Sequence, residues 1–460
     1  MSKSIVILGT MSSAGKSTIV AGLCRLFANM GIKVAPFKAQ NMSNNAAVCK
    51  DGGEIGRAQY LQAIACKIEP IVDMNPILLK PEGNSKSQVI VRGKVWDTVS
   101  AVGYYERKKY LWNIVVESLE NLKSNYELIV VEGAGSPAEL NLKKNDIVNT
   151  AIAKYLNAPT YLVGDIDRGG IFAQLLGTYW LLEDDEKNLI KGFIVNKFRG
   201  DLVLFKSGIE IIEQRAKVPV VGVVPYVDLI LPQEDSTTLD QLSKYEGKID
   251  ICVIAYPHIS NFDDFDALKM EKNVRLRFVS NVQDFANPDV VILPGSKNTI
   301  SDLIWLKSSG FESVLKNYLK NGGKLIGICG GYQMLGKRIY NPHKLEGGIK
   351  QINGLGLLNT QTTFKDKKTT RQISAKMVKN IGFFTDSLLE GYEIHLGYTE
   401  NLDDKHIFEI KIDGELVKDG AFNKDFKVWG TYIHGIFNND DFREKFLQSL
   451  GNDKPSVSYK

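Results

Sequence analysis

Residues 9–18 (GTMSSAGKST) combine glycines, a lysine and hydroxyl side chains at a spacing that suits phosphate binding. In a P-loop the backbone N–H groups face nucleotide phosphates, the lysine reaches the β- and γ-phosphates, and the next hydroxyl binds Mg²⁺. We therefore expect Gly15, Lys16, Ser17 and Thr18 to contact ATP, with Ser17 also a ligand of Mg²⁺.

The loop departs from the standard P-loop pattern at one position. That pattern has a glycine six residues before its lysine, whereas this chain has Thr10 there and Gly9 one position earlier. An ordinary β–α turn that contains Gly-Lys-Ser is the alternative interpretation. The surroundings favour a nucleotide site, because residues 4–8 predict a buried strand and residues 19–23 have helical periodicity.

Two further apolar segments end in side chains that would complete a nucleotide site. Residues 128–136 (LIVVEGAGS) predict a buried strand ending at Glu132, whose carboxylate would hold Mg²⁺ directly or through water. Residues 192–200 (GFIVNKFRG) predict another strand, and we assign Asn196 in it to the nucleotide. An exposed charge at a strand end is the alternative for Glu132.

Residues 34–45 (VAPFKAQNMSNN) predict a short strand that runs into a segment dense in amides. Strand ends of this kind form the crevice of open α/β sheets. We therefore expect Lys38, Gln40, Asn41 and Asn44 to bind a substrate that carries carboxylates or phosphates, although a solvated loop fits the composition equally well.

Residues 327–336 (GICGGYQMLG) place a cysteine between an apolar strand and a helix, with glycines on both sides. Such a nucleophile elbow needs small neighbours, because the turn that projects the cysteine is strained. We expect the N–H of Gly330, and that of Gly295 at the end of another strand, to bind an oxyanion.

A histidine near the C-terminus is the natural partner for Cys329. His434 lies in the glycine-bounded segment 430–437 (GTYIHGIF), and a Cys–His pair performs acyl transfer. The alternatives are a small core residue for Cys329 and a structural histidine for His434.

Apolar strands alternate with helical stretches along the whole chain, which predicts an α/β fold with mostly parallel sheets. The alternation pauses in a polar stretch and then restarts at residue 249. We expect two doubly wound domains, residues 1–232 and 249–451, joined by a linker over residues 233–248.

Composition excludes several classes of protein. The 460 residues carry a net charge of only +4, which gives no reason to expect a nucleic-acid partner. No apolar run is long enough for a membrane span, and the N-terminus is not a signal peptide. The five cysteines have no C-x-x-C spacing, so we expect a reducing cytoplasm; a homo-oligomer is compatible with the sequence.

Together these motifs resemble the glutamine amidotransferases of cobalamin biosynthesis. The C-terminal half resembles a class I glutamine amidotransferase domain. The N-terminal half resembles the dethiobiotin synthetase type of ATP-binding domain, whose loop has the same shifted glycine. Four segments are similar to the cobyric acid synthase family: residues 36–44, 53–59, 165–170 and 257–262.

Two details refine that resemblance. Cobyrinic acid a,c-diamide synthases would carry a Phe-Lys-x-Gly-Pro-Asp-Tyr run, whereas Phe37-Lys38 is followed here by Ala39-Gln40-Asn41. The usual amidotransferase pattern His-x-Glu would place glutamate at 436, where this chain has Ile436. The cobalamin branch is similar in lacking that acid, so a Cys–His dyad is expected, and the group that orients the imidazole is not evident.

The resemblance implies ATP- and glutamine-dependent amidation of a corrinoid, adenosylcobyrinic acid a,c-diamide, at its b, d, e and g carboxylates. ATP would convert each carboxylate to an acyl phosphate, and ammonia released from glutamine would displace the phosphate. A shielded path for that ammonia is a hypothesis.

Two other functions remain open from the sequence. One is a related two-domain amidotransferase that acts on the a,c carboxylates or on a cell-wall lipid precursor. The other is a P-loop regulatory ATPase with an inactive amidotransferase-like domain, against which the presence of both Cys329 and His434 argues.

Overall fold

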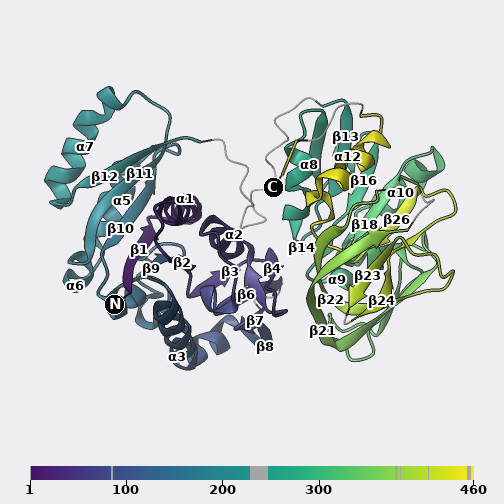
Figure 1. Cartoon of the computed structure of the whole chain (residues 1–460), viewed down its shortest axis with the longest axis horizontal. Coiled ribbons are helices and arrows are strands. Elements are labelled where there is room, and N and C mark those ends of the chain that lie inside the picture. The colour runs from purple at the N-terminus through teal and green to yellow at the C-terminus, as the bar shows by residue number, and fades with distance from the viewer. Residues whose placement is uncertain are drawn as a thin grey trace. The chain divides into compact units, whose positions relative to one another are not determined.

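The chain folds into two compact units, each described here by itself (Figure 1). The computed structural model describes residues 2–83, 86–227, 247–378, 382–383, 385–412, 414–452 and 457–459. The first unit comprises Met1–Ser43, Gly53–Lys80 and Ser85–Leu231, and the second comprises Asn44–Gly52, Pro81–Asn84 and Pro232–Lys460. Of the expected linker, residues 233–246 lie outside the described residues. Two short segments of the N-terminal half therefore fold with the second unit.

The first unit is built on a parallel sheet in the order β12-β11-β10-β1-β9-β2. Its strands are apolar and buried on both faces in the middle of the sheet, as parallel sheets covered by helices require. The strands are β1 Lys3–Gly9, β2 Val34–Phe37, β9 Leu128–Glu132, β10 Thr160–Asp165, β11 Ile190–Phe198 and β12 Val220–Pro225. The helices are α1 Lys16–Asn29, α2 Arg57–Ala65, α3 Ala101–Asn125, α4 Thr150–Leu156, α5 Ile171–Trp180, α6 Asp184–Lys187 and α7 Leu202–Ala216.

A smaller sheet in the order β3-β6-β7-β8 follows the second strand of the parallel sheet in the chain. Its strands are β3 Gln40–Met42, β6 Ile77–Gly83, β7 Lys86–Val91 and β8 Lys94–Ser100, and β5 is Glu54–Gly56. Gln40 pairs with Ile77 and Asn41 with Leu78, so the amide-rich segment after β2 is an ordered strand and not a solvated loop.

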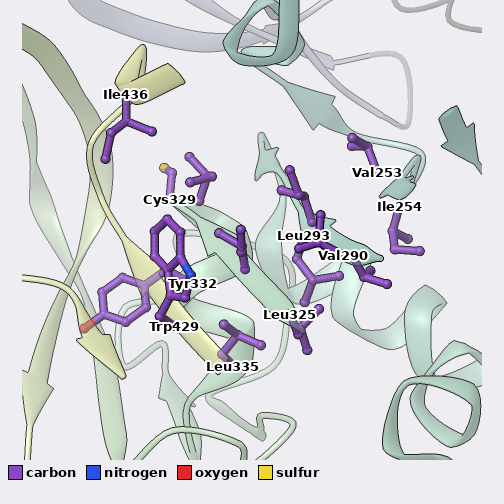
Figure 2. Packing of buried hydrophobic residues seen from close by; sticks show 14 of the residues in the cluster. Val253, Ile254, Val290, Leu293, Leu325, Cys329, Tyr332, Leu335, Trp429 and Ile436 are labelled. Carbon is purple, nitrogen blue, oxygen red and sulfur yellow. The ribbon is translucent and has the colours of Figure 1, made fainter. Parts of the chain in front are cut away.

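The second unit contains a sheet in the order β15-β13-β16-β18-β26-β25, in which all neighbours are parallel except β25 and β26. Its strands are β13 Ile249–Ile254, β15 Val274–Val279, β16 Val290–Leu293, β18 Leu325–Ile328, β25 Ala421–Phe422 and β26 Val428–Thr431. The helices are α8 Asp266–Lys269, α9 Thr299–Ser308, α10 Phe311–Lys320, α11 Gly330–Leu335 and α12 Asp440–Gln448. Cys329 lies at the edge of the hydrophobic cluster between these layers, above Tyr332 and Leu335 (Figure 2).

A mostly antiparallel sheet, in which β19 and β21 pair in parallel, adds to this unit and is not predicted by the strand–helix alternation. Its long strands are β21 Thr360–Met377 and β22 Leu389–Asn401, joined by β19 Arg338–Tyr340, β20 Gln351–Asn353, β23 Phe408–Ile412 and β24 Glu415–Asp419. The polar sequence of β21 alternates buried and exposed residues over much of its length, which is the pattern of a sheet with one solvated face. The short strands β4 Ala46–Val48, β14 Ile259–Ser260 and β17 Gly295–Ser296 also belong to the second unit.

Candidate functional site

Cys329 occupies a strained turn between β18 and α11. Its φ is +51°, a conformation that non-glycine residues adopt rarely, and it precedes the first residue of the helix. Its backbone N–H donates to the carbonyl of Thr431 at 2.8 Å, which ties the turn to β26. A Cβ on Gly331 would collide with the carbonyl oxygen of Leu293, so the turn requires glycine there. The nucleophile elbow predicted from the sequence is therefore present in backbone geometry.

His434 is fully buried and is oriented by a carboxylate that the sequence did not reveal. Its Nδ1 lies 2.7 Å from Oδ2 of Asp264, and Oδ1 of Asp264 accepts a 2.7 Å hydrogen bond from the N–H of Gly435. Asp264 belongs to the short 3-10 helix Phe262–Phe265 and is 2 % exposed. Asp264 thus orients the His434 imidazole. In the usual His-x-Glu pattern a glutamate at position 436 would do so, but this chain has Ile436 there.

Electrostatics favour a protonated His434. Burial by itself lowers the pKa of this imidazole, but Asp264 and Cys329 outweigh burial and raise the pKa to about 10. Nε2 has no hydrogen-bond partner at ordinary distance in the described part of the chain. The Cys329 thiol donates to the carbonyl of Ile394 at 3.4 Å. An imidazolium that interacts electrostatically with a cysteine is the arrangement that activates a sulfur nucleophile.

The two glycines expected to form the oxyanion hole lie beside this pair. A Cβ on Gly295 would come within 3.2 Å of Cε1 of His434, and a Cβ on Gly330 would come within 2.9 Å of the N atom of Ser296. Gly295 pairs with Ser260 in the two-stranded sheet β14–β17. The structure thus brings together Cys329 and Gly330, Gly295, and His434, which come from three separate segments of the sequence.

Strand β22 covers the other side of the pair. Tyr392 forms an isolated β-bridge with His434, and its ring stacks on the imidazole with centroids 5.2 Å apart. The Tyr392 hydroxyl accepts a hydrogen bond from Asn261, three residues before Asp264. The His434 imidazole is therefore held at its edge by Asp264 and on one face by Tyr392.

The P-loop in the first unit has the helix-capping geometry expected of an anion site. Gly15 has φ +96° and precedes α1, and Lys16 is 6 % exposed because its ammonium folds back onto the carbonyls of Met11 and Gly135 at 2.9 and 3.0 Å. A Cβ on Gly9 would lie 2.9 Å from the Lys16 side chain. Position 9 therefore favours glycine, because the Lys16 side chain packs against its backbone. This contact is a physical reason for finding the glycine at position 9 and not at position 10.

Thr10 has its own role in the loop. Its N–H donates to the carbonyl of Val163 at 2.9 Å, and its hydroxyl donates to Oε1 of Gln174 in α5 at 3.2 Å. On the other side of the loop, Nδ2 of Asn196 donates to the carbonyl of Ala14 at 2.9 Å. Thr18 is half-buried in the first turn of α1.

Glu132 is fully buried and forms the centre of a polar cluster next to the P-loop. Its Oε1 accepts from the Ser17 hydroxyl at 2.8 Å and from the Lys38 ammonium at 2.9 Å, and its Oε2 accepts from Gln62 at 2.5 Å. Burial by itself raises the pKa of Glu132, but Lys38, Gln62 and Ser17 together lower it. A carboxylate and a hydroxyl oxygen in contact are the donor set that Mg²⁺ prefers. Among the described residues no group of three or more His, Cys, Asp or Glu could hold a metal ion.

The four residues expected to bind substrate have different partners in the structure. Lys38 contacts Glu132, Asn41 donates to Oε1 of Gln59 at 3.0 Å, and Gln40 accepts from the Tyr104 hydroxyl. These three belong to the first unit, whereas Asn44 belongs to the second. Gln62 was not singled out from the sequence, although its place on α2 after the 53–59 motif was a usable signal.

No described helix is long and apolar enough to cross a membrane.

Comparisons with known proteins place both units in known families. Residues 250–442 match the CobB/CobQ-like glutamine amidotransferase domain, and residues 5–238 match the CobQ/CobB/MinD/ParA nucleotide binding domain. A protein of Dehalococcoides mccartyi (strain CBDB1) named cobyric acid synthase is 49% identical over 460 residues, covering 98% of this chain and 91% of that protein. The proteins of the same name from Clostridium acetobutylicum and Herpetosiphon aurantiacus are 47% and 48% identical, covering 99% and 97% of this chain and 91% of each relative.

A solved structure of PurLQS from Thermotoga maritima aligns with 44% of this chain and 98% of its own, with a TM-score of 0.35 and 17% identity. That similarity is too low to carry an argument about this chain.

Proposed function

This chain belongs to the cobyric acid synthase family, and we propose that it amidates the b, d, e and g carboxylates of adenosylcobyrinic acid a,c-diamide. It is a glutamine-dependent amidotransferase of cobalamin biosynthesis. The observation that carries the proposal is the buried group of Cys329, His434 and Asp264 in a chain that also folds a P-loop.

The glutaminase half of the reaction follows from this geometry. Cys329 attacks the side-chain amide of glutamine, and His434 donates its proton to the departing ammonia. Because Asp264 keeps Nδ1 protonated, Nε2 is the nitrogen that exchanges protons with the thiol, with ammonia and then with water. The N–H groups of Gly330 and Gly295 would stabilise the oxyanion, and water hydrolyses the thioester to glutamate.

The nucleotide half activates the acceptor. A carboxylate does not react with ammonia at a useful rate, because oxide is a poor leaving group, whereas an acyl phosphate loses phosphate readily. Gly15, Lys16 and Thr18 would bind the phosphates of ATP, and Asn196 would support the loop through Ala14.

Ser17 and Glu132 would hold Mg²⁺, which when bound neutralises phosphate charge. The ion pair of Lys38 with Glu132 supports this assignment, since it shows that the carboxylate attracts a cation. Lys38, Gln40, Asn41 and Asn44 remain our proposal for contacts with the acceptor.

The same proposal includes the domain bounds and the setting of the enzyme. We place the amidoligase domain at residues 1–232 and the glutaminase at residues 249–451, joined by 233–248, with the segments noted above added to the second unit. All five cysteines are buried free thiols, which supports a reducing cytoplasm. A homo-oligomer remains compatible with the chain.

The test compares nitrogen sources. Wild type with ATP, Mg²⁺ and the corrinoid should form amides from glutamine or from ammonium salt. Cys329→Ala should lose glutamine use by about 10⁴-fold or more and keep ammonium use. Lys16→Ala should keep glutamine hydrolysis but lose amidation with glutamine and with ammonium salt alike.

Cys252→Ala is the matched control, because Cys252 is equally buried on β13 and takes no part in the chemistry. Glutamine hydrolysis by wild type without any amidation of the corrinoid would refute the acceptor and leave the glutaminase assignment intact.

A further inference from the structure

Beside the catalytic pair, β22 carries two side chains that the glutaminase chemistry above does not use. Glu393 and His395 flank Ile394, whose carbonyl oxygen accepts the hydrogen bond from the Cys329 thiol. Neighbouring Cα atoms lie about 3.8 Å apart, so both residues are close to the nucleophile. Glu393 is 3 % exposed, and the His395 side chain is 9 % exposed.

Nε2 of His395 is buried and has no hydrogen-bond partner among the described residues. Its Nδ1 lies 2.6 Å from the carbonyl oxygen of Gly397, so Nδ1 must carry the proton and donate. Burial lowers the pKa of this imidazole to about 3, which keeps the ring neutral at physiological pH. Nε2 is then an acceptor, and it has no hydrogen-bond partner among the described residues.

A carboxylate oxygen that lies near Nε2 is itself an acceptor. Oε1 of Glu393 lies 4.0 Å from Nε2, too far for a hydrogen bond, while Oε2 accepts from Nε of Arg371. Asp419 lies close enough to Glu393 that burial and this carboxylate raise the pKa of Asp419 to about 7. The missing group between Nε2 and Oε1 is therefore an N–H donor. Glu393 and Asp419 favour a cation there, against the positive charges of Arg371, Lys368 and His434.

The ring of His395 is also held in place relative to the catalytic residues. It stacks on Tyr432 with centroids 3.8 Å apart, and Tyr432 lies between Thr431, which binds the Cys329 N–H, and His434. The Tyr432 hydroxyl is fixed by Gln333 in α11 at 3.1 Å. Through Tyr432, the His395 ring is thus held in a fixed position relative to Cys329.

We propose that Glu393 and His395 bind the α-ammonium group of glutamine while its side-chain amide lies at Cys329. Four bonds separate the amide carbon of glutamine from its α-nitrogen, about 5 Å in an extended chain. Sγ of Cys329 lies 3.4 Å from the carbonyl oxygen of Ile394, the residue between Glu393 and His395. Arg371, which pairs with Glu393, has a side chain that is 34 % exposed, so this end of the pair lies next to solvent.

Ammonia released at Cys329 fits the same acceptors less well. A carboxylate pocket would hold it as ammonium, which is not a nucleophile and would be lost to amidation. The α-ammonium of the intact substrate is a permanent cation at neutral pH and takes no part in the later steps. This inference rests on glutamine hydrolysis at Cys329, which is part of the proposed function.

The test compares glutamine with glutaramate, which is glutamine without its α-ammonium group. Glu393→Gln and His395→Asn should each lower kcat/KM for glutamine hydrolysis by about 10- to 100-fold and leave glutaramate within about twofold of wild type. Asparagine at 395 keeps a donor for the Gly397 carbonyl and removes the Nε2 acceptor together with the ring that stacks on Tyr432, and the glutaramate comparison separates these two losses. If glutaramate turns over too slowly, its inhibition constant against glutamine gives the same comparison.

Controls separate this role from a structural one. Glu400→Gln changes an exposed glutamate on the same strand and should alter neither substrate. Equal losses for glutamine and glutaramate in both variants would overturn the proposal in favour of a structural role. Unchanged glutamine hydrolysis with fewer amides formed per glutamine would overturn it in favour of ammonia. Glutamine hydrolysis is measured without the corrinoid, so these outcomes do not depend on whether the corrinoid is the substrate that is amidated.

Discussion

The amidotransferase site and the nucleotide site differ in what their reactive groups contact in the structure. In the second unit His434 receives its orientation from Asp264 and Tyr392, and its Nε2 is left for the chemistry. In the first unit the reactive groups bind one another, with Lys38 and Ser17 on the same oxygen of Glu132 and Lys16 on two backbone carbonyls.

This difference indicates that the two sites respond differently when their ligands bind. The cysteine site is preorganised, because no internal hydrogen bond of the Asp264–His434 pair has to break before glutamine reacts. In the nucleotide site as we propose it, phosphates and Mg²⁺ would displace the internal partners of Lys16 and Glu132, so binding there would be an exchange of partners. Mutations should therefore affect catalysis in the first case, and stability or nucleotide affinity in the second.

The largest effect on activity is expected at Asp264, and it tests whether the cysteine site is preorganised. Asp264→Asn leaves the size of the side chain but removes the charge that holds Nδ1 protonated, so kcat for glutamine hydrolysis should fall by about 10³- to 10⁴-fold. Wild type should lose activity as pH rises through about 10, where His434 gives up its proton. The residual activity of the variant should be lost about one to two pH units lower, because the pKa of His434 falls.

Asp263→Asn is the neighbouring control, since that carboxylate is equally buried and does not contact His434. A pH profile of kcat/KM that is identical in wild type and Asp264→Asn would show that Asp264 does not set the protonation of His434.

An intermediate effect on stability is expected at Lys38. Lys38→Met leaves Glu132 buried without its cation, and breaking a buried ion pair costs about 3 kcal/mol of unfolding free energy. Urea unfolding should show the loss, and Mg²⁺ with ATP should restore part of it, because the ligand brings a new cation to Glu132. Lys3→Met, an exposed lysine on β1, should change stability by less than about 0.5 kcal/mol. An unchanged midpoint for Lys38→Met would mean that the pair carries no stabilising charge.

The smallest effect should appear at Thr10. Thr10→Val removes only the hydroxyl that donates to Gln174, so KM for ATP should rise by about two- to tenfold while glutamine hydrolysis stays unchanged. Steady-state ATP kinetics with ammonium as nitrogen source measure this directly. A fall in KM would instead indicate that the Thr10 tether restrains the loop from closing on phosphates.

The sequence predicted the parts of each site that depend on short segments. Cys329 with its glycines and Lys16 with Ser17 are found where the strand, turn and helix patterns placed them, because those patterns are local. The parallel sheets followed from the same alternation. Family membership and glutamine-dependent amidation are likewise confirmed by the relatives.

What the sequence missed depends on contacts between distant segments. Asp264 and His434 are 170 positions apart, and nothing in the isolated segment 261–265 distinguishes Asp264 from Asp263. The direction of Lys38, toward Glu132, is decided by the parallel pairing of β2 with β9. The antiparallel strands β21 and β22 escaped because a search for alternating strands and helices does not recognise a long polar strand with only every second residue buried.

The membership of Asn44–Gly52 in the second unit has a consequence for splitting the gene. Asn45 accepts from the N–H of Phe262, the carbonyl of Ala46 accepts from Asn261, and the carbonyl of Val48 accepts from Gln372. A polypeptide begun at residue 249 would therefore lack a brace for the very turn that carries Asp264. Gene fission at the linker would therefore yield a glutaminase that lacks these three hydrogen bonds unless the upstream segment is supplied in trans.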